Sequence, residues 1–209
     1  MLRQFTVSLF ALSLVGCAAT GVPYSSDPQQ KLADARMLFL QHDRPLPAGP
    51  MILQAIEILE TQDQPLQLAE AYRTYGLFLN SAAVERYRST YQNIGFNHAS
   101  ISFEQRHQGA IEYYSKAAEI LQQQDQLDYL SNTYLNIGIS YSHQQQVDKA
   151  CAMYVKSLAT HRLFQQQNPD HEIAMPEPFS SYEQYIQHQM TVNKCPPSAI
   201  TAAKFSNND

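Results

Sequence analysis

The feature that most constrains the fold is a pair of helix-like patterns between residues 131 and 158, separated by a short polar turn. Gly138 lies in the first pattern and Ala150 lies in the second, twelve residues later. Because neither residue carries a bulky side chain, two helices can approach closely where these positions meet. This stretch is therefore predicted to form a helical hairpin. Mostly aromatic and apolar residues recur around the two positions at helical spacing, with Tyr134, Ile137 and Tyr141 before the turn and Tyr154 and Ser157 after it.

This spacing resembles the tetratricopeptide repeat. In that family an aromatic residue, an apolar residue, a glycine and a tyrosine mark the first helix, and an alanine, an aromatic residue and a small residue mark the second. The resemblance implies an all-α fold, in which residues 29–166 form a short solenoid of about three helical hairpins, followed by a C-terminal capping helix. It also implies that ligands bind on the concave face that the first helices form. The composition agrees, because the 209 residues include only 7 glycines.

A second copy of the pattern is split along the chain. Gly76 lies in a first-helix pattern and Ala110 in a second-helix pattern, but 34 residues separate them instead of 12. This predicts an insert over about residues 80–104. A competing register pairs Ala110 with Gly95, which precedes it by 15 residues. The turn-forming residues around Gly95 favour the insert.

Weaker patterns flank these two copies. Residues 29–42 and 51–61 each carry an apolar stripe at helical spacing, and the proline-rich stretch 43–50 is predicted to separate them as a break. At the other end of the chain, we expect a loop and capping helix over residues 167–195 and a disordered tail over residues 196–209.

The N-terminus reads as an export signal. Arg3 precedes an apolar run over residues 5–15, which is too short to cross a bilayer of about 30 Å, and Cys17 follows closely. This order resembles the bacterial lipobox. The resemblance implies that residues 1–16 are a lipoprotein signal peptide and that Cys17 carries acyl chains such as palmitate. The alternative is an ordinary secretory signal with a chance cysteine.

The residues after Cys17 bear on localisation. The residue that follows it is Ala18 rather than aspartate, which among such lipoproteins implies the outer membrane. Residues 17–28 are rich in small and turn-forming side chains and are predicted to be a flexible tether. We therefore expect a protein anchored by lipid to the outer membrane and facing the periplasm.

The two remaining cysteines suit an oxidising compartment. Cys151 and Cys195 are predicted to pair as a disulfide, since two cysteines in an exported domain most simply pair. Two unpaired buried thiols are the alternative. A metal site is not expected, because the chain has no CxxC motif and no histidine pair at helical spacing beside a cysteine.

Catalytic and cofactor motifs are missing from the sequence. It contains no glycine-rich nucleotide loop, no GxSxG and no HExxH, so we expect neither an enzyme nor a bound cofactor. The net charge of −5 argues against a nucleic-acid partner, which would require a clustered basic excess.

Two sets of residues are candidates for binding a protein partner. On the concave face implied by the repeat register these are Arg73, Leu77, Asn80, Asn132, Asn136, Ile139 and His143. In the insert they are Arg86, Arg88 and Tyr91, because arginine and tyrosine are enriched at binding hot spots. The alternative for the insert is a loop that only packs over the repeats.

The function that the sequence predicts is a lipid-anchored periplasmic adaptor that mediates protein–protein interactions in the cell envelope. Assembly of an envelope complex, as by a pilotin, is a more specific form that rests on analogy with the repeat family alone. The rival function is that of an envelope hydrolase or of its regulatory subunit.

Overall fold

The computed structural model describes residues 21, 24–97, 100–171, 173 and 175–199. Over these residues the chain forms nine α-helices and no strand, so the prediction of an all-α fold is confirmed. The helices are α1 (Pro28–Leu40), α2 (Pro45–Glu60), α3 (Pro65–Asn80), α4 (Ala82–Arg86), α5 (Arg88–Ile94), α6 (Arg106–Gln123), α7 (Leu127–His143), α8 (Val147–Gln167) and α9 (Tyr182–Val192).

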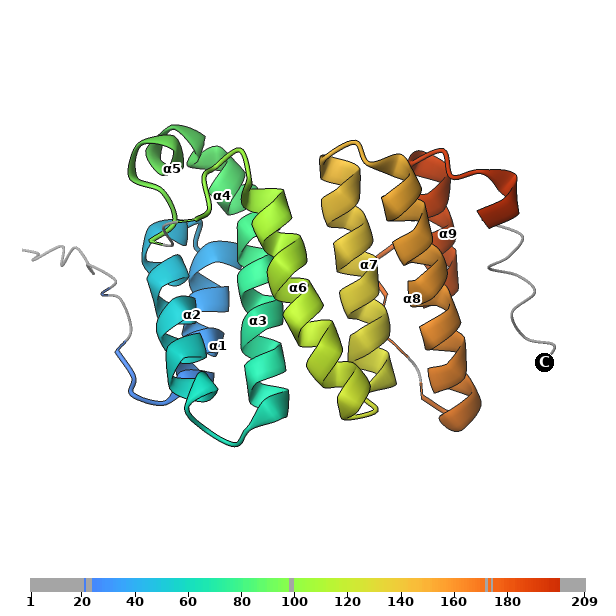
Figure 1. Cartoon of the computed structure of the whole chain (residues 1–209), viewed down its shortest axis with the longest axis horizontal. Coiled ribbons are helices and arrows are strands. Elements are labelled where there is room, and N and C mark those ends of the chain that lie inside the picture. Colours follow the sequence, from blue (N-terminus) through green and yellow to red (C-terminus); the bar gives the residue numbers. More distant parts are fainter. Residues whose placement is uncertain (1–20, 22–23, 98–99, 172, 174, 200–209) are drawn as a thin grey trace, which may run out of the picture.

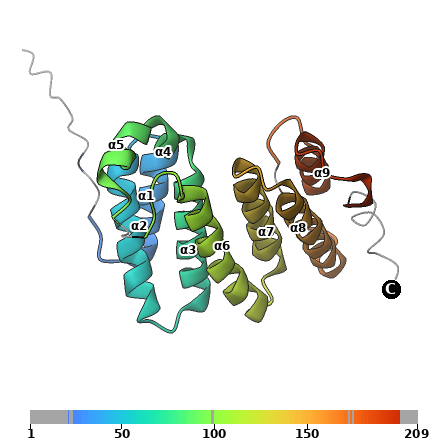
Figure 2. The ribbon, with the colours of Figure 1, turned by 45° about the horizontal axis from the view of Figure 1, so that its top comes forward.

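The long helices pack as three successive pairs: α1 with α2, α3 with α6, and α7 with α8 (Figure 1). Along the row, α2 contacts α3 and α6 contacts α7. The first helices of the pairs also contact one another, α1 with α3 and α3 with α7, so they line one face of the molecule. The turned view in Figure 2 shows the same succession, with α9 beyond α8 at the far end.

Proline begins each of the first three helices. Pro28, Pro45 and Pro65 stand in the first turn, where the missing N–H has no intrahelical partner to lose and the fixed φ suits a helix. The predicted break over residues 43–50 therefore extends too far: residues 41–44 separate the two helices, and α2 already starts at Pro45. Only Pro50 lies beyond the first turn, so it alone removes a regular helical hydrogen bond.

Glycine meets an aromatic ring at the centre of two pairs. A Cβ added to Gly76 would stand 2.8 Å from the ring of Tyr114 on α6, and one added to Gly138 would stand 2.5 Å from Tyr154 on α8. Both rings are buried. Gly76 thus packs directly against α6, although the residues between α3 and α6 separate the two helices in the sequence. This is the arrangement that an insert requires. A Cβ added to Gly95, the glycine of the competing register, would have no atom within 4 Å.

The segment between α3 and α6 folds onto the end of the first two pairs. It contains α4 and α5 and leads into a buried aromatic cluster, in which the Tyr91 ring stacks on Phe96 at 4.5 Å and meets Phe78 edge-on at 6.2 Å. Val84 and Phe103 are buried as well. The insert therefore contributes several side chains to the hydrophobic core.

The C-terminal part covers α8. Helix α9 packs on α8, and Cys195, which follows α9, is bonded to Cys151 with a Cα–Cα distance of 5.6 Å. Ile186 and Met190 of α9 are fully buried beside this disulfide. Residues 197–199 are again helical, which corrects the prediction that the disordered tail begins at residue 196.

Several predicted features lie outside the described residues. These are the signal peptide over residues 1–16, half of the tether, namely residues 17–20 with Cys17 and residues 22–23, and the tail beyond residue 199. Where the chain is described, none of its helices combines the length and the hydropathy that a membrane crossing demands.

Candidate functional site

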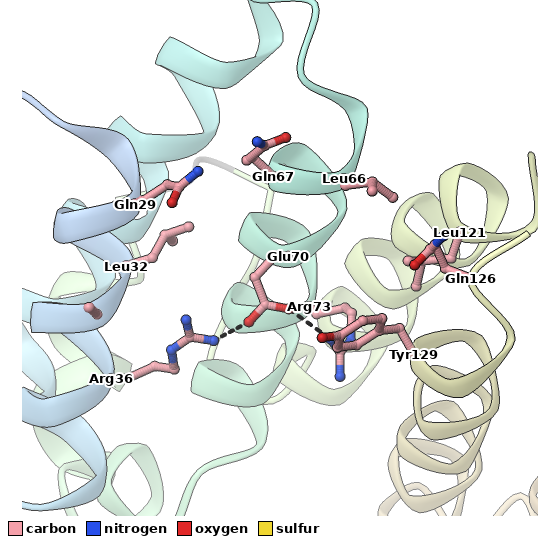
Figure 3. Close-up of a pocket in the computed structure, with 11 residues that line it drawn as sticks. Gln29, Leu32, Arg36, Leu66, Gln67, Glu70, Arg73, Leu121, Gln126 and Tyr129 are labelled. Atoms are coloured by element: carbon pink, nitrogen blue, oxygen red, sulfur yellow. Dashed lines mark hydrogen bonds and ion pairs between the residues drawn. The ribbon is translucent and has the colours of Figure 1, made fainter. Parts of the chain in front are cut away.

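A hollow of about 730 Å³ lies on the face formed by the first helices of the three pairs. It is bounded by α1 on one side, α3 in the middle and the α6–α7 turn on the other (Figure 3). Its volume falls within the range of natural binding pockets. The lining residues are Gln29, Leu32, Ala33, Arg36, Leu66, Gln67, Glu70, Arg73, Leu121, Gln126 and Tyr129.

A continuous line of polar contacts, which we call the ladder, crosses this face. Its members are Arg36, Glu70, Arg73, Asn132 and Asn136. Arg36 of α1 is ion-paired with Glu70 of α3, whose other oxygen accepts a hydrogen bond of 2.7 Å from Arg73. Arg73 also donates to Asn132 Oδ1 on α7 at 2.9 Å, and Asn136 Nδ2 donates to the same oxygen at 3.0 Å. The ladder therefore joins all three first helices.

The guanidinium of Arg73 is held from several directions. Besides its two hydrogen bonds it lies over the Tyr129 ring, with Cζ 5.1 Å from the ring centroid. Its side chain is only 17% exposed. A cation fixed by a carboxylate, an amide and an aromatic face has little freedom to bind a ligand directly. Arg73 thus serves mainly to position Glu70, Asn132 and Tyr129.

Arg36 stands in a different environment. Its side chain is 35% exposed. Only its Nη1 is engaged: it is ion-paired with Glu70 and donates a hydrogen bond of 3.3 Å to Thr74 Oγ1. Towards the rest of the described chain, Nε and Nη2 make no hydrogen bond. Arg36 therefore presents a cationic edge to the hollow.

The other walls of the hollow are apolar with amide groups at the margin. Leu32 and Leu121 are buried beneath it, whereas Leu66 and Tyr129 remain 40% and 48% exposed. Figure 3 shows Gln29 on α1 and Gln67 on α3 near the same end of the hollow. A ligand would therefore meet apolar surface, amide donors and acceptors, and one cationic edge.

The predicted concave-face residues divide into two groups. Arg73, Asn132 and Asn136 belong to the ladder, and only Arg73 of these lines the hollow. The others lie further along the same face, where Leu77 and Ile139 are half-buried, Asn80 is half-buried and His143 is exposed.

Asn80 connects the ends of three helices in this second group. Its Nδ2 donates to Ser140 Oγ on α7 at 2.7 Å, and its Oδ1 lies 2.7 Å from Nδ1 of His107 on α6. The ring of His143 stacks on that of His107, with centroids 4.6 Å apart. These polar groups are paired with one another, so this part of the face is a structural junction.

Burial and neighbouring cations set the protonation of the stacked histidines. Desolvation, with the positive charge of Arg106 and the proximity of His143 adding to it, lowers the pKa of His107 to about 4. Desolvation and Arg106 also lower the pKa of His143. Both rings are therefore neutral near pH 7, which permits the close stacking.

The three predicted insert residues differ in exposure. Tyr91 is only 4% exposed, because its ring packs between Phe78 and Phe96, so its prediction as a partner-binding residue is wrong. Arg86 pairs with Asp43 at 2.6 Å, and Arg88 pairs with Glu85. Both arginines stay exposed: Arg86 has Asp43 as its partner, whereas Arg88 shares the carboxylate of Glu85 with Arg106.

Sequence reasoning missed much of the hollow. It did not identify Arg36, Leu66 or Tyr129, which together supply the cationic edge and the exposed apolar rim. A usable signal was present for Arg36, since it stands at helical spacing from Leu32 in the stripe of residues 29–42. No comparable pattern marked Tyr129, which lies in the first turn of α7.

A second cavity, of about 680 Å³, lies between the end of α8 and the start of α9. Arg162 of α8 donates to Glu183 of α9 at 2.6 Å across it, and His161 is buried at its base against Tyr182. Over the described ranges, no group of three or more His, Cys, Asp or Glu side chains is placed to hold a metal ion.

Comparison with known proteins adds no relative to this description. No protein-family model, no curated protein and no solved structure matches the chain.

Proposed function

We propose that this protein is a non-catalytic adaptor of the bacterial cell envelope, which binds a segment of a protein partner in the hollow between α1, α3 and α7. The observation that carries the proposal is the hollow itself, with its exposed apolar rim and its cationic edge. A preformed pocket on packed helices limits the conformational entropy that is lost on binding.

The proposal includes a repeat architecture and an anchor. We take the three helical pairs to be tetratricopeptide-like repeats in a short solenoid, with α9 as the capping helix. The successive pairing of the helices and the glycine–aromatic contacts at Gly76 and Gly138 support this assignment. Cys17 would carry the acyl chains that hold the protein at the outer membrane. Several chains are needed for stable attachment, since each buried methylene contributes only about 0.8 kcal/mol.

Site-specific photocrosslinking in cells tests the adaptor role. A photoreactive amino acid at Gln67, inside the hollow, is expected to capture a defined partner from the full-length lipoprotein. The matched control carries it at Glu112, which is exposed on α6 outside the hollow. A partner that is captured from position 67, lost in a Tyr129→Ala variant and absent from position 112 supports the proposal. Equal capture from both positions, or capture from neither, would overturn it.

Lipid attachment has its own test. Cells fed with labelled palmitate should incorporate the label into the full-length protein and not into a Cys17→Ser variant. Equal labelling of the two would show that Cys17 is not the acylated residue.

A further inference from the structure

We propose that the segment taken by the hollow is an extended peptide in which an acidic side chain stands beside an apolar one. In this arrangement the acidic group binds the free edge of Arg36, and the apolar side chain packs between Leu66 and Tyr129. This inference rests on the proposed adaptor function and specifies its ligand.

The charge balance of the ladder points to an acidic group. Two arginines, Arg36 and Arg73, share the single carboxylate of Glu70, which leaves one positive charge uncompensated within the ladder. Arg73 is fixed on both sides and its one unpartnered nitrogen, Nε, is buried, so the free donors that a ligand can reach are those of Arg36. Two parallel N–H groups on the edge of a guanidinium match the two oxygens of a carboxylate.

The apolar rim points to a neighbouring apolar side chain. Leu66 on α3 and Tyr129 on α7 face the same hollow and keep 40% and 48% of their surface exposed. Leu121 on α6 and Leu32 on α1 are buried and line the same hollow. A ligand side chain placed there would remove apolar surface from water on several sides, which is the main favourable contribution in such pockets.

The amides at the margin suit an extended backbone. Gln29 and Gln67 come from different helices and line the same hollow, as Figure 3 shows. Each side-chain amide can both donate to and accept from a main-chain peptide group. In a helical ligand those main-chain groups would already be paired internally, so the amides favour an extended one.

Glu70 opposes the ligand that we propose. Its carboxylate lies beside Arg36 and repels a second carboxylate that approaches the same guanidinium. A Glu70→Gln variant keeps the shape of the side chain and removes this repulsion. We therefore expect Glu70→Gln to bind an acidic peptide about threefold to fivefold more tightly than the wild type does.

Fluorescence anisotropy on the full-length protein in detergent micelles is the test. The probes are labelled peptides with capped ends that contain Leu-Glu-Leu or Leu-Gln-Leu, and a Leu-Gln-Leu peptide whose C-terminal carboxylate is free. The Leu-Glu-Leu peptide should bind about fivefold more tightly than its glutamine counterpart. Arg36→Gln should abolish this difference. The matched control Arg86→Gln removes an exposed, ion-paired arginine outside the hollow and should leave the difference intact.

The outcomes separate this inference from the adaptor proposal. Equal binding of the two capped peptides, or a preference that survives Arg36→Gln, would overturn the acidic ligand even if a partner is crosslinked at position 67. The peptide with the free C-terminus could also bind more tightly than the capped Leu-Glu-Leu peptide. The preferred group would then be a C-terminal carboxylate and not an internal acidic side chain, and this result would also overturn the inference. A gain of affinity in Glu70→Gln cannot arise from misfolding, which makes it the most decisive support.

Discussion

Gly138 of α7 lies directly beneath the ring of Tyr154 of α8, so closely that a single methyl group at position 138 would stand 2.5 Å from a ring carbon. The main-chain oxygen of Ala150 lies 3.2 Å from the same point. Tyr154 is fully buried and its hydroxyl accepts a hydrogen bond of 3.2 Å from Asn193 Nδ2. Burial and this hydrogen bond therefore hold the ring in place.

Gly138→Ala is consequently expected to destabilise the fold by about 1–3 kcal/mol, since overpacking at this contact outweighs the better helix propensity of alanine. Urea unfolding followed by circular dichroism measures the change. Gly21→Ala, at an exposed position with no atom within 4 Å, should stay within about 0.5 kcal/mol of the wild type. A stabilised Gly138→Ala variant would show that the two helices are further apart than described.

Removing the disulfide should lower the stability by up to about 4 kcal/mol, because the bond closes a loop between residues 44 positions apart. For a chain of this size, this corresponds to a decrease in Tm of roughly 8–16 °C. The measurement is thermal unfolding of a Cys151→Ala, Cys195→Ala double variant against the wild type. Thiol titration of the unreduced, denatured protein should detect neither cysteine; two free thiols would contradict the pairing.

Tyr91 should behave as a core residue. Tyr91→Ala is expected to destabilise the protein by about 3–4 kcal/mol, by loss of the contacts with Phe78 and Phe96. Tyr91→Phe should be neutral or slightly stabilising, because the buried hydroxyl has no partner within the described chain. Ile94→Ala, at a position 62% exposed, is the control and should change little. Comparable effects at positions 91 and 94 would place the insert outside the core.

Acid should destabilise the fold through the stacked histidines. The pKa of His107 is about 4 in the folded state and about 6.5 when unfolded, so the unfolded chain takes up this proton first. The stability that the neutral ring contributes is complete above pH 6.5 and is lost as the pH falls towards 4. After a discount for the partly exposed ring, we expect a loss of about 1–2 kcal/mol.

An NMR titration of the histidine ring protons checks this prediction. The midpoint for His107 should lie near pH 4 and move upwards in a His143→Gln variant, because the neighbouring ring helps to lower it. A midpoint at or above 6 in the wild type would mean that the ring is solvated and the stack is open.

The helical pairs could be predicted from the sequence because they depend on spacing. Gly138 and Tyr154 belong to a short-range periodic pattern, and such a pattern determines which faces of two adjacent helices meet. Tyr91 could not be placed in the same way. It lies in a helix of only seven residues, which is too short for periodicity to separate an inward from an outward face.

The hollow depends on contacts between residues that are far apart in the sequence, and no local sequence pattern predicts such contacts. Arg36 and Glu70 stand 34 residues apart, and only the packing of α1 against α3 brings their charges together. The same packing decides which of the two arginines keeps unpaired donors at the surface. The residues of the concave face could therefore be predicted from the repeat register. The part of that face that forms a cavity could not be predicted in this way.

The ladder has a thermodynamic consequence. Arg36 and Arg73 share one carboxylate, and Arg73 in turn holds Asn132 on α7. A ligand that draws Arg36 away from Glu70 changes the electrostatic potential at Arg73. The free energy of the hydrogen bond between Arg73 and Asn132 of α7 then changes as well. By reciprocity, a second ligand that breaks the contact between Arg73 and Asn132 changes the affinity for a ligand at Arg36 by the same factor as the first ligand changes the affinity for the second. The two ends of the hollow are thus energetically linked through a single glutamate.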